Sequence, residues 1–450
     1  METEGQGTGK QWTGVVQASL HGGWKTFLAI LGDFSQIHRM KIMHTGDWHL
    51  GKRLERFDRM DEHTAVMEEI CQIAEAEAVD AVLVAGDLYD TFNPPTEAVQ
   101  LLYRTLKRLA RDGRRPVIAI AGNHDSPDRI EAPDPLASEC GIIFAGYPQT
   151  HVRPFQLPGG MEVTRSAPGF IEVRIPSSPS PLRIILAPYP SESRLRMDLG
   201  SENLEATIRE LLQGRWAELA GQYCDGQGVN ILLGHLFMVS QGEAAPDEHA
   251  EEEKSIGPAS MVFTQNLPQG IQYAALGHIH SFLTMTGGPC PAVYSSSTLP
   301  FSFPKRGENA DAGTRNVVII EGEPGQALRY RPVRLSAGRK LYRRLFPSTE
   351  AALGWLRENP ECFAEISIET EHYISAEERR QIMAAHQRVV GPIPVFRNQE
   401  RKNEANPRAI DRSKAREDLF RDYFVHVKGV EASEEMIALF REVAGREVAE

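Results

Sequence analysis

The sequence lacks several features that would mark a secreted, membrane or nucleotide-binding protein. Only five of its 450 residues are cysteine, and none belongs to a C-x-x-C pair. A sparse, odd-numbered set of this kind indicates reduced thiols in a cytoplasmic protein. No apolar run approaches the roughly 20 residues that cross a bilayer. A Gly-rich loop followed by Lys is also missing, so we expect the chain itself to bind no nucleotide.

An excess of positive charge is missing as well. The chain has 49 Lys and Arg against 61 Asp and Glu, which gives a formal net charge of −12. This balance excludes a protein that coats nucleic acid through its overall charge, but it allows an enzyme with one local basic surface. The hydrophobic content of 41% is that of an ordinary globular protein, and the length allows two or three domains.

The sequence does contain a repeated pattern in which a short apolar run ends in residues that bind metals. The stretch KIMHTGDWHL at 41–50 is the first example, and four more follow. A Gly often stands beside the polar residues and allows a sharp turn. One such histidine alone usually has a structural role, but five similar run ends predict a metal centre. The residues are Asp47, His49, Asp87, Asn123, His124, His235, His278 and His280.

The first of these runs alternate with helical patterns. We expect strands before Gly46, at 81–85 and at 117–121, with helices at 59–78 and after Thr96, a suitable helix N-cap. This β-α-β-α-β order predicts an α/β fold with a parallel section in its sheet. Because the carboxyl ends of parallel strands meet at one edge, the eight residues should line one crevice.

The mixture of ligand types narrows the chemistry of the predicted centre. Carboxylates, one amide and several imidazoles without a thiolate suit manganese or iron, and zinc less exclusively. The set is too large for a single ion. A shared carboxylate, most naturally Asp87, would bridge two ions about 3.5–4 Å apart. Such a pair activates water for the hydrolysis of phosphoesters.

Taken in order, the motifs Asp-x-His, Gly-Asp-x-x-Asp, Gly-Asn-His-Asp, Gly-His and Gly-His-x-His resemble those of the calcineurin-like metallophosphoesterases. The resemblance covers about residues 40–334. It implies a β-sandwich of two packed sheets flanked by helices, which periodicity alone does not predict. It also implies two divalent metal ions, for which we expect manganese, with iron or magnesium as alternatives.

Carried over residue by residue, this resemblance assigns roles to the site. One ion would be held by Asp47, His49, Asp87 and His280. The other ion would be held by Asp87, Asn123, His235 and His278. His124 is expected to give a proton to the leaving oxygen, and Asp125 to orient His124. Asp90 is also a catalytic candidate, although its role stays open because some relatives have His there. Ser296 stands where Gly is typical.

Other stretches are similar to the SbcD nucleases of this family, among them GDLYDTFNPP at 86–95 and YSSSTLPFSF at 294–303. This similarity implies a DNA nuclease with double-strand exonuclease and single-strand or hairpin endonuclease activity, acting in DNA repair, recombination and replication. It implies an SbcC-type ATPase partner, a homodimer within a heterotetramer, and a cytoplasmic location at the nucleoid. The alternatives are a phosphomonoesterase or cyclic-nucleotide phosphodiesterase of the same fold, and a non-catalytic scaffold.

Two further groups of residues are candidates for binding macromolecules. Basic residues after the first ligand pair and in the small C-terminal module would contact DNA, with solvated surface charge as the alternative: Lys52, Arg53, Arg56, Arg59, Arg343 and Arg344. Apolar residues in the tail would dock as a helix in a groove of the partner, with packing on the chain's own core as the alternative. These are Leu419, Phe420, Tyr423, Phe424, Met436 and Phe440.

We therefore expect four segments. Residues 1–39 match nothing in the family, and Met40 is the expected start of the natural chain. Residues 40–335 form the nuclease domain, although the Pro-, Gly- and Ser-rich part at 150–180 should be irregular or edge structure. Residues 336–400 form a small α/β DNA-capping domain. Residues 401–450 form a charged linker and a helical tail that binds the ATPase partner.

Overall fold

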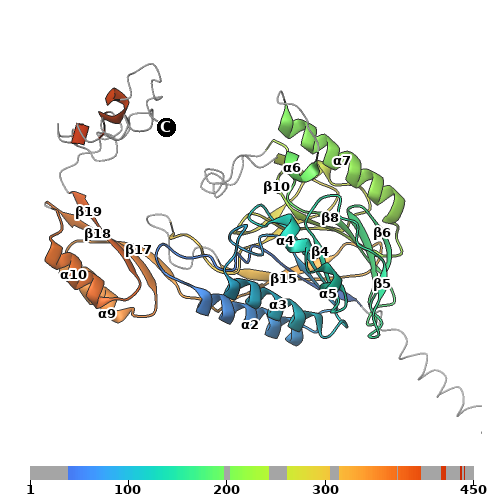
Figure 1. Ribbon diagram of the computed structural model, residues 1–450, viewed down its shortest axis with the longest axis horizontal. Helices are drawn as coiled ribbons and strands as arrows, with labels where there is room; N and C mark the ends of the chain where they lie inside the picture. Colours follow the sequence, from blue (N-terminus) through green and yellow to red (C-terminus); the bar gives the residue numbers. More distant parts are fainter. Residues whose placement is uncertain are drawn as a thin grey trace, which may run out of the picture.

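The computed structural model describes residues 39–196, 203–242, 261–304, 314–371 and 373–396, and in the tail 417–421, 436, 437 and 440. Residues 1–38 of the extension predicted at 1–39 lie outside these ranges, as do Tyr423 and Phe424 of the tail. Two lobes are visible in Figure 1. The larger lobe contains two large sheets with their helices, and the smaller contains strands β17–β19 with helices α9 and α10.

The first sheet has the strand order β16-β15-β1-β2-β3-β4. Strands β1 to β4 are parallel, whereas β15 and β16 are antiparallel to their neighbours. The strands are β1 (Met40–Thr45), β2 (Ala81–Val84), β3 (Val117–Ile120), β4 (Ile142–Ala145), β15 (Asn316–Gly322) and β16 (Arg329–Arg334). The parallel section confirms the expected β-α-β-α-β arrangement.

Helices cover the outer face of this sheet, because strands that are apolar on both faces must be buried on both. Helix α2 (Met60–Ala76) and helix α3 (Thr96–Ala110) bury one stripe each, with Val66 and Leu102 in the shared core. Two short helices, α4 (Pro127–Glu131) and α5 (Asp134–Ser138), precede β4. The predicted N-cap of α3 is wrong by one residue, because Pro95 is the extended cap residue and Thr96 is already helical.

The second sheet has the order β13-β14-β12-β9-β8-β7-β6-β5. Its strands are β5 (Phe155–Gln156), β6 (Glu162–Ala167), β7 (Phe170–Arg174), β8 (Leu182–Ala187), β9 (Val229–His235), β12 (Tyr273–Gly277), β13 (Phe282–Met285) and β14 (Ala292–Ser295). Strands β5 to β7 lie at one edge, as expected for the region 150–180. Helix α7 (Leu204–Tyr223) packs on the outer face through residues such as Trp216. Smaller elements of this half are α6 (Glu192–Leu195), β10 (Phe237–Val239), β11 (Met261–Phe263) and η1 (Thr264–Asn266).

The two sheets pack face to face, which confirms the sandwich implied by the family resemblance. Their inner faces contribute one continuous core that includes Leu83 and Ile118 from the first sheet and Ile184 and Ile231 from the second. Burial of each aliphatic side chain contributes roughly 2 kcal/mol to the free energy of folding, so this core contributes most to holding the two sheets together. It therefore also fixes which strand ends stand opposite each other.

The small lobe is a parallel three-stranded sheet in the order β17-β18-β19. Its elements are β17 (Leu341–Phe346), α9 (Thr349–Glu358), β18 (Phe363–Thr370), α10 (Ala376–Ala385) and β19 (Val389–Phe396). A separate apolar cluster joins it to the larger lobe, with Leu54 and Phe303 on one side and Leu341 and Phe363 on the other.

All five cysteines of the chain are free thiols. Among the described helices, none has the length and apolar character needed to cross a membrane.

Candidate metal centre

The predicted ligand residues come together where strand ends of the two sheets meet. Asp47, Asp87 and Asn123 follow β1, β2 and β3 of the first sheet, and His235 and His278 stand at the ends of β9 and β12 of the second. Strands β9 and β12 are parallel and paired, with Gly277 opposite His235. The face-to-face packing of the sheets brings both groups of residues into one crevice, as the strand pattern predicts.

The backbone of the site is unusual, because several candidate ligands have a positive φ. Asp47, His49, Asp87 and His278 have φ values of 50°, 43°, 49° and 103°. Such conformations cost about 1–3 kcal/mol each and persist only when other contacts impose them. Here main-chain hydrogen bonds hold the loops, from Asp47 N to Gly86 O at 3.0 Å and from His49 N to Asp87 O at 2.9 Å.

Gly122 shows how tightly the loops are packed. A Cβ atom at this position would lie 2.1 Å from the Asp87 Oδ1 atom and 2.3 Å from its main-chain nitrogen. No side chain fits there without moving the carboxylate that we expect to bridge two ions. The Gly that precedes Asn123 in the sequence is therefore required by this close approach, and not by φ.

The imidazole of His235 faces oxygen atoms that have no hydrogen to donate. Its Nδ1 lies 2.8 Å from the Ala85 carbonyl oxygen, which can only accept, so Nδ1 carries the hydrogen. Its Nε2 lies 2.8 Å from Asn123 Oδ1 and 3.5 Å from Asp87 Oδ2. Burial lowers the pKa of His235 to about 3, so Nε2 is not protonated at neutral pH. Three lone pairs thus point at one another, an arrangement that a cation stabilises.

A second group of candidate ligands also approaches the Oδ2 atom of Asp87. The Nε2 atoms of His49 and His280 are 3.0 Å apart, and His49 Nε2 is 3.3 Å from Asp87 Oδ2. Burial, followed by the neighbouring imidazole of His280, holds the pKa of His49 well below 6.5. Asp47 has a ligand atom within 4.8 Å of those of His49 and His280, and another group joins Asp47, Asp87 and His235.

These contacts fit the two ligand sets expected from the sequence, with Asp87 between them. Asn123 Oδ1 also lies 3.0 Å from His278 Nδ1, which extends the group around His235. Imidazole, carboxylate and amide donors are the ones that Mn²⁺ and Fe²⁺ accept. The residues present therefore fit a pair of divalent metal ions that share the Asp87 carboxylate.

His124 stands beside the centre, and Asp90 is the residue that positions it. The main-chain oxygen of Asp90 accepts a hydrogen bond from His124 Nδ1 at 2.7 Å, which leaves Nε2 of His124 for other contacts. The Asp90 carboxylate accepts from Lys52 Nζ at 2.7 Å and lies 3.5 Å from His49 Nδ1. Asp90 thus contacts the candidate ligand His49, the candidate acid His124 and the ammonium group of Lys52.

The expected role of Asp125 in orienting His124 is wrong. Its buried carboxylate accepts hydrogen bonds from the main-chain N–H groups of Leu88, Tyr89 and Gly122 at 2.8–3.0 Å. Burial and the nearby Asp87 raise the pKa of Asp125 to about 7. The residue fastens the loop after β2 to the loop after β3, so it positions Asp87 and Asn123 rather than the imidazole.

Sequence reasoning missed Arg194, which lies in α6 and has no motif around it. Its guanidinium donates to the main-chain oxygens of Gly122 and Asp125, both at 2.7 Å, and of Asn123 at 3.3 Å. Phe301 was also missed as a site residue, although it lies in the stretch 294–303 that is similar to the SbcD nucleases. Its ring packs against those of His49 and His280, with centroid distances of 5.1 and 5.6 Å.

The basic residues proposed for DNA binding have different environments. Lys52 is at the metal centre, whereas Arg53 and Arg56 are exposed on the loop that follows it. A DNA contact is wrong for Arg59, because its guanidinium is buried and donates to the Glu62 carboxylate and the Pro300 oxygen.

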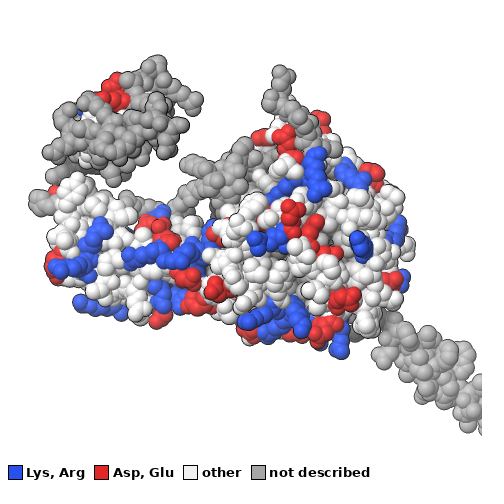
Figure 2. Space-filling view, viewed as in Figure 1, with Lys and Arg blue, Asp and Glu red and all other residues white. Residues whose placement is uncertain are grey.

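The other two basic candidates are in the small lobe, where Arg343 is paired with Glu365 and Arg344 lies over Trp355. Basic side chains are visible over this lobe and toward its junction with the larger one in Figure 2. In the tail, the described candidates are Leu419, Phe420, Met436 and Phe440. The rings of Phe420 and Phe440 stack on each other with centroids 4.3 Å apart.

Comparison with known proteins agrees with this geometry. The family model described as calcineurin-like phosphoesterase matches residues 40–282. The chain is 32% identical over 413 residues to the SbcD chain of the SbcCD nuclease of Bacillus subtilis, which covers 90% of this chain and 98% of that protein. It is 31% identical over 299 residues to the corresponding SbcD chain of Rhodobacter capsulatus, covering 65% and 69% of the two chains.

Solved structures with similarity to the chain are more distant. TT1561 of Thermus thermophilus is 11% identical with a TM-score of 0.34, covering 66% of this chain and 100% of its own. A dimetal phosphatase from Danio rerio is 12% identical with the same TM-score, covering 66% and 99%. From the family model and the Bacillus relative, the chain belongs to the calcineurin-like phosphoesterases, and within them to the SbcD family of metal-dependent nucleases.

Proposed function

We propose that this chain is the nuclease component of a complex with an SbcC-type ATPase, and that it cuts DNA from double-strand ends and endonucleolytically at hairpins and single strands. The observation that carries the proposal is the convergence of imidazole, amide and carboxylate atoms around Asp87. We propose manganese as the ion in the cell, since it accepts this donor set, with iron or magnesium as alternatives.

The proposed mechanism assigns one ion to Asp47, His49, Asp87 and His280. It assigns the second ion to Asp87, Asn123, His235 and His278. Ions held by these residues would neutralise the phosphate charge and would lower the pKa of an attacking water. His124 gives a proton to the departing oxygen, with its Nδ1 hydrogen held on the Asp90 carbonyl oxygen. Asp125 and Arg194 keep the two ligand loops fixed during the reaction.

The DNA backbone would run along the junction of the two lobes. A groove of about 560 Å³ lies there, lined by Arg56 of the loop after the metal centre and by Arg379 of α10. Arg56 also donates to the main-chain oxygen of Val389 at 3.4 Å. Arg379 is exposed and forms no ion pair with another described residue. Guanidinium groups that are not neutralised by carboxylates are suited to phosphates.

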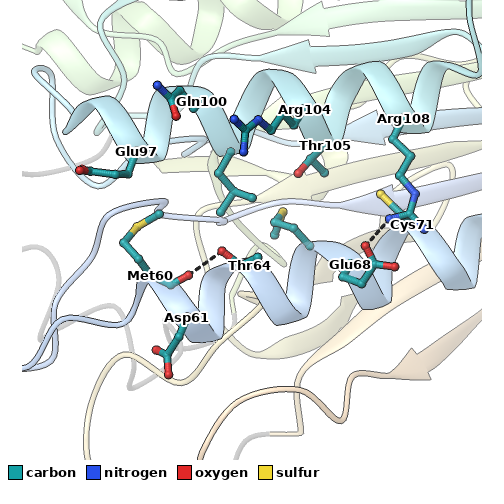
Figure 3. A pocket seen from close by; sticks show the side chains of 12 residues that line it. Met60, Asp61, Thr64, Glu68, Cys71, Glu97, Gln100, Arg104, Thr105 and Arg108 are labelled. Carbon is teal, nitrogen blue, oxygen red and sulfur yellow. Dashed lines mark hydrogen bonds and ion pairs between the residues drawn. The ribbon is translucent and has the colours of Figure 1, made fainter.

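We also propose that the chain forms a homodimer, with its interface at the groove between α2 and α3 (Figure 3). This groove of about 720 Å³ has Met67 and Leu101 among its lining residues. Acidic and basic side chains stand along the same groove, including Glu97 and Arg104, while Arg108 pairs with Glu68. A two-fold interface needs a surface that is complementary to itself, and mixed charge beside an apolar floor meets that need.

The tail would bind the ATPase partner. Stacking of Phe420 on Phe440 holds two tail segments together, and Met436 is 40% exposed beside the buried Ile437. A small helical unit of this kind offers an apolar face to a groove in another protein. We propose that the assembly works in the cytoplasm on chromosomal DNA.

The test is cleavage of end-labelled hairpin DNA in the presence of Mn²⁺, with and without the partner and ATP. Wild type should cut, and His124→Ala should bind the metal but not cut. His151→Ala, an exposed histidine that lies outside the site, is the matched control. If wild type leaves DNA intact but hydrolyses a small phosphomonoester or cyclic nucleotide, the nuclease proposal fails. If wild type binds no metal and cuts neither substrate, a scaffold role replaces it.

A further inference from the structure

Phe92 is exposed beside the metal centre. It lies in the loop between β2 and α3, two residues after Asp90, and 53% of its side chain is accessible. The other large hydrophobic side chains that are exposed in the described part of the chain lie away from the ligand loops, on α5, α7, the small lobe and the tail. A single exposed aromatic residue is common on protein surfaces, so its environment decides whether it has a role.

The backbone around Phe92 is held at both ends. Before it, Asp90 is fixed by the hydrogen bond from His124 to its main-chain oxygen and by the ion pair with Lys52. After it, Asn93 Oδ1 accepts from Arg129 at 3.0 Å, and Pro95 is the N-cap residue of α3. Two residues span at most about 7 Å of chain, so Phe92 stays within reach of the groups around His124. The backbone at Phe92 is therefore held close to the reaction centre, with the ring open to solvent.

The groups near Phe92 match the parts of a nucleotide. Lys52 supplies a positive charge next to the metal ligands, and the proposed ions take the phosphate. An exposed aromatic ring on the loop that carries Asp90 suits the base of the same or the adjacent nucleotide. In a duplex that base is stacked and paired, whereas in a hairpin loop or a single strand it is available.

We infer that Phe92 is a stacking platform for an unpaired nucleobase of the strand being cut. This inference rests on the proposed function as a DNA nuclease and adds to it a residue that selects unpaired DNA. Stacking of a base on an aromatic ring tolerates any sequence, because every base has a π-face. The platform thus favours hairpin and single-strand substrates over an intact duplex without reading their sequence.

The experiment uses the full-length chain with its ATPase partner, Mn²⁺ and ATP. Phe92→Ala should lower kcat/KM on a hairpin with an unpaired loop by about tenfold, the usual size of one stacking contact. Phe92→Tyr should restore the rate, and Phe92→Leu should not, because leucine is apolar but cannot stack. Hydrolysis of bis(p-nitrophenyl) phosphate should be unchanged in all three variants. Leu136→Ala, at a residue 78% exposed on α5, is the matched control.

An abasic nucleotide in the hairpin loop provides a second measurement. It removes the base from the DNA, as Phe92→Ala removes the ring from the protein, so the two changes together should cost no more than one alone. Equal cleavage by Phe92→Ala and wild type, full rescue by Phe92→Leu, or additive effects of the two changes would each overturn the inference alone. Failure of wild type to cut any DNA would overturn the proposed function together with it.

Discussion

The Nε2 atom of His235 lies 2.8 Å from Oδ1 of Asn123, and both atoms are hydrogen-bond acceptors. The hydrogen of His235 is on Nδ1, where it bonds the Ala85 carbonyl oxygen. The contact between these two residues, which are 112 positions apart, is therefore unfavourable unless both atoms bind a cation. Asn123 follows a strand of the first sheet and His235 ends a strand of the second, so the packing of the two sheets sets this distance in the metal site.

Metal addition should stabilise the wild-type protein through this contact. At a free Mn²⁺ concentration one hundred times Kd, the free energy of unfolding should rise by about 2.7 kcal/mol over the EDTA-treated protein. His235→Ala should lose most of this gain, and His151→Ala should retain it. Thermal unfolding with and without Mn²⁺ measures the effect. An equal shift in wild type and His235→Ala would show that His235 is not a ligand.

Arg194→Met should weaken metal binding although Arg194 touches no ion. The substitution removes hydrogen bonds to three main-chain oxygens of the loop that carries Asn123. Loss of such outer contacts usually costs about 10- to 100-fold in metal affinity. Titration calorimetry with Mn²⁺ measures the change, and Arg174→Met, an exposed arginine on β7, is the control. Unchanged affinity in Arg194→Met would mean that the loop holds its shape without this residue.

Glu62→Ala should destabilise the protein strongly at the lobe junction. The Glu62 carboxylate is buried, pairs with the buried Arg59 and accepts from the main chain of Arg339. Removal of one partner from a buried ion pair costs about 3–5 kcal/mol. Asp61→Ala, which removes an exposed carboxylate from the same helix, should cost less than about 1 kcal/mol. Urea unfolding compares the two variants, and similar losses would contradict the prediction.

Ser296 has a φ of 80°, which a glycine adopts without strain. Its hydroxyl oxygen accepts from Asn316 N at 2.9 Å, and the next residue donates to the His280 carbonyl oxygen. Ser296→Gly removes strain of about 1 kcal/mol and a hydrogen bond of similar value, so its stability should stay near wild type. Ser296→Ala keeps the strain and loses the bond, so thermal unfolding should rank it lowest. A more stable alanine variant would refute this account.

His44 should make the metal-free protein sensitive to acid. Its buried ring lies 3.1 Å from the Leu276 oxygen, and burial lowers its pKa from 6.5 to about 3. Between pH 6.5 and 3 the unfolded chain therefore binds a proton that the folded chain does not, so stability falls as the pH falls. The loss from His44 between about pH 6.5 and 5.5 should be about 1 kcal/mol. Urea unfolding of His44→Gln should show a flatter pH dependence than wild type or the exposed control His151→Gln.

The local elements near the site followed well from the sequence. Apolar runs at 81–85 and 117–121 became β2 and β3, and the helix expected at 59–78 is α2. The partners of side chains were predicted less well. Asp125 bonds main-chain groups of Leu88 and Gly122 instead of His124, and Arg59 is buried against Glu62. Those contacts depend on the direction of each side chain after its loop has folded, which residue type and spacing do not specify.

The sequence by itself determined the ligand types, their place after apolar runs and the α/β character of the chain, because these depend on residue chemistry and local periodicity. Only the tertiary structure decided that Arg194 supports Asn123, that the Asp90 oxygen holds His124, and that Phe92 stays exposed two residues after Asp90. The reason is that packing of the two sheets, driven by burial of their inner faces, sets the distances between loops far apart in the chain. No local pattern records those distances.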